Sequence, residues 1–362
     1  MPISAPTLSG PEYTDPAIFR LEQQRIFHAG WFLACRADTL AKGNRKVIDV
    51  AGESILVARD LDDTIHAYAN VCRHRGARLC DRDSDSTQGS LMCPYHAWTY
   101  ALDGRLISTP HLDDTQVDKA ALSLWKVAVQ VWEGFVFVCL ADQPPAWEDW
   151  FSVHGAEVAP LARYGLGALR VAVTTRADVH ANWKIIIENY QECLHCPRVH
   201  PELVGIVPAY RSGHVLDPSR PDGGVALADQ GTSFSRSGKS SLPILPGLDD
   251  VDAHSYFGST VFPNAFVDVT GTSAILTTMY PVAPDRTIVT ADYMFAPETI
   301  AADGFDPSEI VEFSELVAAQ DFDVCERVQR GVGSRLFRGG LLTEKDDLVI
   351  GFIDHYRAAL GA

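Results

Sequence analysis

The chain has 362 residues, of which 46% are hydrophobic and 21% charged, and this ordinary globular composition predicts two domains or one large domain with an insertion. The formal net charge of −17 argues against nucleic acid and anionic membrane surfaces as partners. The apolar runs are too short to cross a bilayer, and the first residues lack the basic and apolar segments of a signal peptide, so we expect a cytoplasmic protein.

The N-terminal part predicts one helix followed by strands. Asp15 suits the N-cap of a helix over residues 15–29, which Gly30 would end. Residues 45–140 are mostly β in character. The proline-interrupted segment 142–150 is expected to link this part to the rest of the chain.

The C-terminal part separates strands from helices. The expected strands are 170–179, 261–269, 274–281 and 287–295, and the expected helices are 181–196, 308–330 and 345–360. Residues 211–256 are rich in Gly, Ser, Pro and Asp and predict a long loop, which in a compact domain is usually functional. Because strands and helices do not alternate along this part, the predicted fold class is α+β.

Two short motifs in the β-rich part each contain one Cys and one His. Cys72-Arg-His74 and Cys93-Pro-Tyr-His96 fit a Rieske [2Fe–2S] centre, in which two Cys hold one iron and two His hold the other. The same residues could close a tetrahedral zinc site, but zinc-dependent folds are usually small, whereas these motifs lie in a large strand-rich domain. The hairpin signal Asp103–Gly104 places the motifs on β loops. A Rieske centre relays single electrons, so an acceptor is expected elsewhere.

Six further cysteines belong to neither motif. Their spacing is not that of a disulfide scaffold, and the chain shows no export signal. We therefore expect reduced thiols at Cys35, Cys80, Cys139, Cys193, Cys196 and Cys325.

A second set of potential metal ligands lies at the end of the expected helix 181–196. His195 and His200 do not share one face of an intact helix, but Pro197 between them breaks the helix and allows His200 to turn back. With a carboxylate from residues 320–331 they would form the two-His, one-carboxylate triad of non-haem Fe(II) oxygenases. Two His near a helix end more often cap or pack, but the electron-relay motif favours a metal site.

Together these motifs resemble Rieske non-haem iron oxygenase α subunits, the ring-hydroxylating oxygenase family. The resemblance spans almost the whole chain and rests on Cys72-x-His74, Cys93-x-x-His96, Asn182-Trp183-Lys184, Glu192-x-x-His195, His200-Pro201 and Asp321-x-x-x-x-Glu326-x-x-Gln329. It implies a Rieske domain in residues 41–145 and a helix-grip catalytic domain with a central antiparallel sheet in residues 146–362. The N-terminal helix, within residues 1–40, would pack on the catalytic domain.

The resemblance also assigns the mononuclear iron ligands. His195, His200 and one aspartate would hold Fe(II), and Asp321 and Asp323 compete for the third place. In the family the ligand aspartate lies five residues before a glutamate of the same helix. Counting back from Glu326 selects Asp321 and makes Asp323 an ordinary solvated charge.

Glu192 is expected to connect the two metal centres. In the homotrimer that the resemblance implies, it would bridge His195 to a cluster histidine of the neighbouring subunit, and so orient and couple both ligands. The alternative is an ordinary exposed helix glutamate.

The electrons are expected to come from NADH or NADPH through a separate reductase, with or without a ferredoxin, because the chain has no dinucleotide-binding fingerprint. Arg73, Arg75 and Arg78 crowd the first cluster loop. They would either form a docking patch for an acidic redox partner or brace the loop.

The expected substrate follows from one branch of the family. Glu192-x-x-His195 resembles the choline monooxygenase, carnitine oxygenase and betaine demethylase branch, whose substrates carry a quaternary ammonium that aromatic rings can hold by cation–π attraction. The candidate rings are Tyr190, Tyr210, Tyr256, Phe257, Phe262 and Phe266. Segment 211–256 is expected to cover the pocket. The alternatives are aromatic-ring hydroxylation or dihydroxylation, aromatic O-demethylation, and electron transfer without catalysis.

Overall fold

The structure is a computed structural model that describes residues 4–83, 89–110, 112–217, 220 and 223–361. The chain divides into two compact units, one of which comprises Phe27–Trp147. The other joins the residues up to Ile26 to those from Glu148 onward. The N-terminal helical segment therefore belongs to the larger unit, although the whole smaller unit separates it in sequence from the rest of that larger unit.

The smaller unit consists of two antiparallel sheets. Its strands are β2 (Trp31–Arg36), β3 (Arg45–Val50), β4 (Glu53–Arg59), β5 (Ile65–Ala69), β6 (Ser90–Met92), β7 (Thr99–Ala101), β8 (Leu106–Ser108), β9 (Lys126–Trp132) and β10 (Phe135–Cys139). One sheet has the order β2-β10-β9-β5-β4-β3 and the other β6-β7-β8. The expected turn at Asp103–Gly104 joins β7 to β8, and Gly104 has a φ of +86°, where a Cβ would meet the Tyr68 ring.

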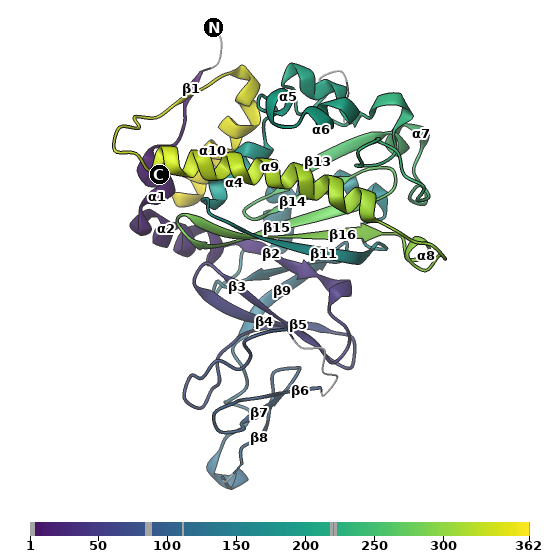
Figure 1. The fold of residues 1–362 in the computed structure, drawn as a ribbon. Coiled ribbons are helices and arrows are strands. Elements are labelled where there is room, and N and C mark those ends of the chain that lie inside the picture. Colours follow the sequence, from purple (N-terminus) through teal and green to yellow (C-terminus); the bar gives the residue numbers. More distant parts are fainter. Residues whose placement is uncertain (1–3, 84–88, 111, 218–219, 221–222, 362) are drawn as a thin grey trace. The chain divides into compact units, whose positions relative to one another are not determined.

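The larger unit contains one antiparallel sheet of six strands (Figure 1). These strands are β11 (Arg170–Val179), β12 (Val225–Ala226), β13 (Ser255–Val261), β14 (Ala265–Val269), β15 (Ala274–Ala283) and β16 (Arg286–Phe295). Their order is β11-β16-β15-β14-β13-β12. Side chains alternate between the faces of a strand, so Phe266 and Asp268 of β14 point to the same side. A short pair, β1 (Ala5–Pro6) with β17 (Leu341–Leu342), joins the two ends of the chain.

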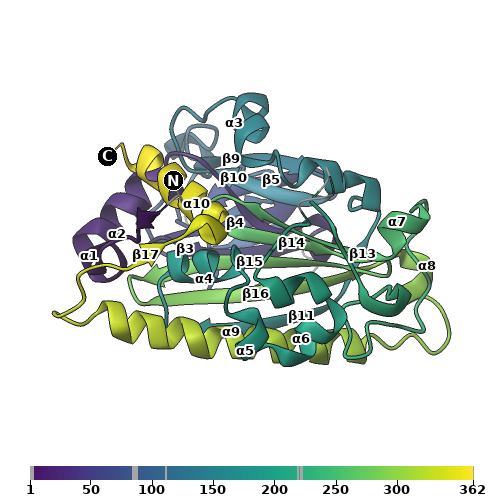
Figure 2. The same ribbon diagram turned by 90° about the horizontal axis from the view of Figure 1, so that it is seen from above.

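The larger unit also contains α-helices. They are α1 (Gly10–Thr14), α2 (Pro16–Glu22), α3 (Trp147–His154), α4 (Trp183–Tyr190), α5 (Cys196–Val199), α6 (Pro201–Ile206), α7 (Asp250–Ala253), α8 (Pro297–Ile300), α9 (Ser308–Val332) and α10 (Asp347–Leu360). The long helix α9 contacts α4 and β11, and Figure 2 shows it beside β11 along the sheet. The segregated sheet and helices confirm the α+β fold class. No helix among the described residues is both long and apolar enough to span a membrane.

Two predicted elements have other bounds in the structure. The helix predicted over residues 181–196 is α4, which starts after the N-cap Asn182 and stops at Tyr190. Pro197 does not end α4 but lies in the first turn of the separate helix α5. The strand predicted over residues 261–269 is two strands, because Phe262, Pro263 and Asn264 form the turn between β13 and β14. Both differences arise where side-chain or turn geometry overrides the local propensity.

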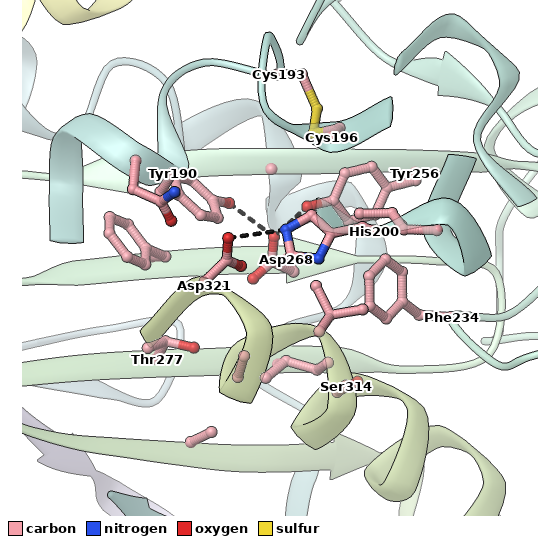
Figure 3. Close-up of a pocket in the computed structure, with 18 of the residues that line it drawn as sticks. Tyr190, Cys193, Cys196, His200, Phe234, Tyr256, Asp268, Thr277, Ser314 and Asp321 are labelled. Carbon is pink, nitrogen blue, oxygen red and sulfur yellow. Dashed lines mark hydrogen bonds and ion pairs between the residues drawn. A yellow bond between two sulfur atoms is a disulfide. The ribbon is translucent and has the colours of Figure 1, made fainter. Parts of the chain in front are cut away.

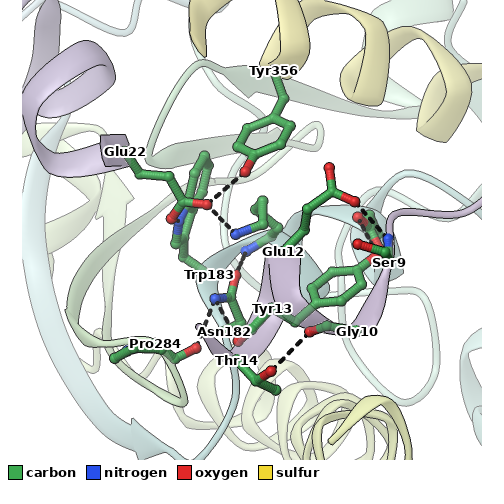
Figure 4. Close-up of polar contacts among 12 residues, drawn as sticks. Ser9, Gly10, Glu12, Tyr13, Thr14, Glu22, Asn182, Trp183, Pro284 and Tyr356 are labelled. Atoms are coloured by element: carbon green, nitrogen blue, oxygen red, sulfur yellow. Dashed lines mark hydrogen bonds and ion pairs between the residues drawn. The ribbon is translucent and has the colours of Figure 1, made fainter. Parts of the chain in front are cut away.

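The N-terminal segment is fixed to the larger unit by buried polar contacts around Glu22 (Figure 4). The Glu22 carboxylate accepts hydrogen bonds from Lys184 Nζ at 2.5 Å, Trp183 Nε1 at 2.9 Å and the Tyr356 hydroxyl at 2.7 Å. The Asn182 side chain donates to the Tyr13 carbonyl at 3.1 Å. Since Glu22 and Lys184 are completely buried, each charge depends on the other for compensation.

Candidate metal and substrate site

Three side chains from separate elements converge in the larger unit. His195 lies just before α5, His200 lies between α5 and α6, and Asp321 lies in α9. One potential ligand atom from each falls within 4.8 Å of the others. Asp321 Oδ1 is 2.8 Å from His200 Nε2 and 3.2 Å from His195 Nε2. The short helix α5 brings the two histidines together, although they do not share a face of one continuous helix.

The outer nitrogen of each histidine contacts a second side chain. Glu192 Oε1 lies 2.5 Å from His195 Nδ1, and Gln320 Oε1 lies 2.7 Å from His200 Nδ1. Such contacts fix the tautomer and the ring orientation, leaving Nε2 of both rings directed to the common site. Glu192 Oε2 also accepts a hydrogen bond from the Leu194 backbone amide in the turn that follows α4. Sequence reasoning missed Gln320, although its position next to Asp321 was a usable signal.

The charges at this site favour a bound cation. Burial lowers the pKa of His195, but the hydrogen bonds to Asp321 and Glu192 outweigh it and raise that pKa to about 9. Burial raises the pKa of Asp321, but hydrogen bonds from His195 and His200 outweigh it, so that pKa is lowered. Two carboxylates thus face two imidazoles, an arrangement in which a positive charge is stabilised.

The donor set fits Fe(II). Two imidazoles and one carboxylate on one side of a metal leave coordination positions open, as in the non-haem iron oxygenases. Asp323 offers no such contact, because its side chain is 59% exposed and pairs with Arg327 at 2.8 Å. The geometry thus groups Asp321, and not Asp323, with the two histidines.

The four residues of the Cys/His motifs lie on neighbouring loops of the smaller unit. Cys72 and His74 follow β5, while Cys93 and His96 lie between β6 and β7. Both sulfurs are buried, His74 is exposed, and the two imidazole rings are 4.7 Å apart between centroids. His96 Nδ1 is buried and has no hydrogen-bond partner among the described residues. This unsatisfied nitrogen beside paired cysteines fits a ligand position of a Rieske cluster.

The arginines of the first cluster loop have partners within the smaller unit. Arg73 donates to the Ser123 carbonyl at 2.5 Å and stacks on the Trp125 ring at 4.2 Å. Arg78 contacts both carboxylate oxygens of Asp49, at 2.8 and 2.9 Å. These contacts favour bracing of the loop for Arg73 and Arg78.

A cavity of about 190 Å³ opens beside the His195, His200 and Asp321 cluster (Figure 3). Among the predicted aromatic residues, Tyr190, Tyr210, Tyr256 and Phe266 line it. Tyr190 and Phe266 are stacked with centroids 3.8 Å apart. Segment 211–256 contributes Val215, Leu216, Gly223, Phe234 and Tyr256 to the lining, and its residues 218–219 and 221–222 lie outside the described part of the chain.

Two other predicted pocket residues lie elsewhere. Phe262 packs against His154, Trp183 and His355 in a separate aromatic cluster. Phe257 lines a neighbouring cavity, and the Arg163 guanidinium lies 4.6 Å from its ring centre. The alternation of β13 turns Phe257 away from the main cavity, and Phe262 lies in the turn after β13, neither of which their aromatic character could reveal.

Sequence reasoning also missed Asp268, which lines the same cavity. Its Oδ1 accepts hydrogen bonds from Tyr190 at 2.7 Å and Tyr256 at 2.6 Å. The available signal was its position two residues after Phe266 on a strand.

The expectation of six reduced thiols is wrong for one pair. Cys193, in the loop after α4, forms a disulfide with Cys196, the first residue of α5. The turn that ends α4 brings these residues close together, whereas a continuous helix was expected there. Cys35, Cys80, Cys139 and Cys325 are buried and are not part of this disulfide.

Comparison with known proteins gives a consistent family assignment. The family described as ring hydroxylating alpha subunit (catalytic domain) matches residues 166–362, and the Rieske [2Fe-2S] domain matches residues 30–128. The glycine betaine monooxygenase oxygenase subunit of Chromohalobacter salexigens is 31% identical over 97% of this chain and 85% of that protein. The carnitine monooxygenase oxygenase subunit of Acinetobacter baumannii is 30% identical, covering 92% of this chain and 87% of that protein.

The fold is also similar to a solved structure. A quaternary ammonium Rieske monooxygenase superposes with a TM-score of 0.78 at 24% identity, covering 97% of this chain and 95% of that one. This similarity confirms the predicted architecture of both parts of the chain. The chain therefore belongs to the ring-hydroxylating oxygenase α subunits and carries both the Rieske [2Fe–2S] domain and the catalytic domain of that family.

Proposed function

We propose that this chain is the terminal oxygenase component that hydroxylates or oxidatively demethylates a small quaternary ammonium compound with O₂. The observation that carries this proposal is that His195, His200 and Asp321 open directly onto a cavity with aromatic walls. Fe(II) bound by these residues would supply O₂ activation next to the substrate. The relatives named for glycine betaine and carnitine support this substrate class.

The [2Fe–2S] cluster would be held by Cys72, His74, Cys93 and His96. We propose that its electrons originate from NAD(P)H and arrive through a separate reductase, with or without a ferredoxin. The names of the relatives support this division of labour, because each describes an oxygenase subunit.

We further propose a homotrimer in which Glu192 connects two subunits. Its Oε1 already contacts His195 Nδ1, and a cluster histidine of the next subunit would supply the other end of the bridge. The exposure of His74 supports this arrangement, because an outward-facing imidazole is available for a contact between subunits.

The test is oxygen consumption by the iron-loaded protein with a surrogate reductase and NADH. Quaternary amines, aromatic acids and aromatic ethers are compared, and O₂ uptake is matched to product because uncoupled O₂ reduction mimics turnover. Formaldehyde or an aldehyde formed from a quaternary amine in proportion to O₂ is the expected result. A diol or phenol formed from an arene, or demethylation of only the ethers, would replace this proposal. Iron content equal to the cluster alone would point to electron transfer without catalysis.

A further inference from the structure

The cavity beside the candidate iron site is lined by four acidic side chains, and apart from the two candidate iron ligands His195 and His200 its described lining has no basic side chain. Its acidic residues are Glu192, Asp268, Glu315 and Asp321, and no Lys or Arg appears among its described lining residues. The residues that the structure does not describe include no Lys or Arg either. Fe(II) at the candidate site would formally offset Glu192 and Asp321 but not the other two. The cavity therefore has an excess of negative charge that a ligand must match.

Asp268 has one carboxylate oxygen in hydrogen bonds and a second one available to a cation. Both of its hydrogen bonds, from Tyr190 and Tyr256, end on Oδ1. Among the described residues, no group forms a hydrogen bond or ion pair with Oδ2, and this oxygen is not completely buried. Oδ2 is therefore available to a ligand in the cavity. In Figure 3 the carboxylate of Asp268 lies between Tyr190 and Tyr256.

Aromatic rings surround this carboxylate. The Tyr190 ring stacks on Phe266 at 3.8 Å between centroids, and the Tyr256 ring stacks on Phe234 at 5.5 Å. Ring faces attract cations, and a buried carboxylate strengthens that attraction in surroundings that exclude water. A quaternary ammonium has no N–H to donate, so it suits a site that offers charge and ring faces.

We propose that Asp268 is the counter-charge for the substrate ammonium and that the site selects a net cation over a zwitterion carrying its own carboxylate. This inference rests on the proposed function and narrows its substrate class. A carboxylated ammonium compound would place its negative charge beside Asp268, in a cavity that has no Lys or Arg among its described lining residues. An ammonium alcohol avoids this repulsion, which gives the site its selectivity.

The test measures binding to the intact, iron-loaded protein by calorimetry at pH 8 without O₂. Choline is the cation, 3,3-dimethylbutan-1-ol is its neutral isostere, and glycine betaine is the zwitterion. Asp268→Asn keeps an oxygen that can accept from both tyrosines. Glu315→Gln is the matched variant, because Glu315 Oε1 also accepts two hydrogen bonds, from Thr175 and Tyr293, each at 2.8 Å.

The expected results separate charge from shape. The wild-type protein should bind choline at least about tenfold more tightly than the neutral isostere or glycine betaine, and Asp268→Asn should abolish this preference while the affinity for the isostere is kept. Glu315→Gln should retain the preference. Rieske absorbance and the unfolding temperature report whether Asp268→Asn is folded.

Three results would overturn the inference: equal affinity of the wild-type protein for choline and glycine betaine, equal weakening of choline and the isostere in Asp268→Asn, or loss of the preference in Glu315→Gln alone. Each of these is compatible with wild-type oxidation of a quaternary amine, in which case the proposed function stands. Absence of both binding and product for every quaternary amine with wild-type protein would refute the proposed function as well.

Discussion

At the scale of single residues, the candidate iron site depends on side chains that do not touch the metal position. Gln320 contacts His200 Nδ1 as Glu192 contacts His195 Nδ1. Replacing Gln320 with Leu removes the acceptor and frees the His200 ring to change tautomer and orientation. We expect iron affinity at the mononuclear site to fall about 10–100-fold, because outer contacts of metal-bound histidines have effects of this size.

The measurement is iron content after dialysis against a graded chelator. Rieske absorbance should stay unchanged, since Gln320 lies in the larger unit. Asp323→Asn is the control, because Asp323 lies on the same helix but pairs with Arg327 at the surface. Equal iron retention by Gln320→Leu and the wild-type protein would mean that Gln320 does not support His200.

Asp268 predicts a pH dependence of cation binding. Burial raises the pKa of its carboxyl group to about 6, although hydrogen bonds from Tyr190 and Tyr256 lower it. The tyrosines that face it, Tyr190, Tyr210 and Tyr256, have pKa values raised by burial and stay neutral. Choline affinity should therefore be highest above pH 6 and fall as the pH drops below it.

The neutral isostere should bind with little change over the same range, and Asp268→Asn should flatten the choline profile. The stability of the folded protein depends on pH in the opposite direction to choline affinity. A group whose pKa is raised by folding stabilises the protein at low pH, and this contribution is lost as the pH rises through about 6. Without ligand, Asp268→Asn should therefore unfold at a higher temperature than the wild-type protein at pH 8. A choline profile of Asp268→Asn identical to that of the wild-type protein would assign the pH effect to other groups.

At the scale of elements, the N-terminal helix α2 is joined to α4 and α10 by the Glu22 network. Glu22→Ala leaves Lys184 buried without its counter-charge. We expect the free energy of unfolding to fall by about 3–5 kcal/mol, as for other buried ion pairs that lose one partner. Burial already lowers the pKa of Lys184, although Glu22 opposes this. Chemical unfolding followed by circular dichroism measures the loss.

The matched control is Arg327→Ala, which removes an exposed pair of the same kind, Arg327 with Asp323 at 2.8 Å. Because solvent screens exposed pairs, this change should cost no more than about 0.5 kcal/mol. Similar losses in the free energy of unfolding for both variants would mean that burial does not increase the contribution of the Glu22–Lys184 pair.

The elements also explain how far the sequence could lead. Long periodic elements such as α9, and β11 with its polar and apolar alternation, were predictable because their own residues determine them. The end of α4 at Tyr190 was not predicted; in the turn that follows, the Leu194 backbone amide donates to the Glu192 carboxylate instead of continuing the helical hydrogen bonds. This turn also produces the Cys193–Cys196 pair, so one unpredicted turn accounts for two errors.

Some residues of the candidate site could likewise be found from the sequence, and others could not. His195, His200 and Asp321 were found from their spacing and their resemblance to a family. Asp268 was not found from the sequence, because its role depends on the register of β14 against β13. In this register Gly258 lies opposite Asp268, and the lack of a side chain at Gly258 makes room for the tyrosine hydroxyls. Residue type alone could not separate Phe266, which lines the cavity, from Phe257 and Phe262, which do not.

At the scale of the whole molecule, the proposed trimer makes Glu192 a connection between subunits. Glu192→Gln keeps an oxygen for His195 but removes the charge that would couple the two imidazoles. We expect both metal centres to remain bound, while the Rieske cluster is reoxidised by O₂ and substrate at least about tenfold more slowly. Stopped-flow absorbance of the reduced protein measures this rate. Unchanged reoxidation would remove Glu192 from the path.

The central claim is that the two parts of the chain act as donor and catalytic site of one oxygenase. The most direct test is a single turnover of chemically reduced, reductase-free protein mixed with O₂ and a quaternary amine. We predict that product forms as the Rieske absorbance returns to the oxidised form, and that Asp321→Ala keeps the cluster spectrum but gives no product. Asp323→Ala should behave as the wild-type protein does. Product formation by Asp321→Ala, or its loss only in Asp323→Ala, would contradict the account.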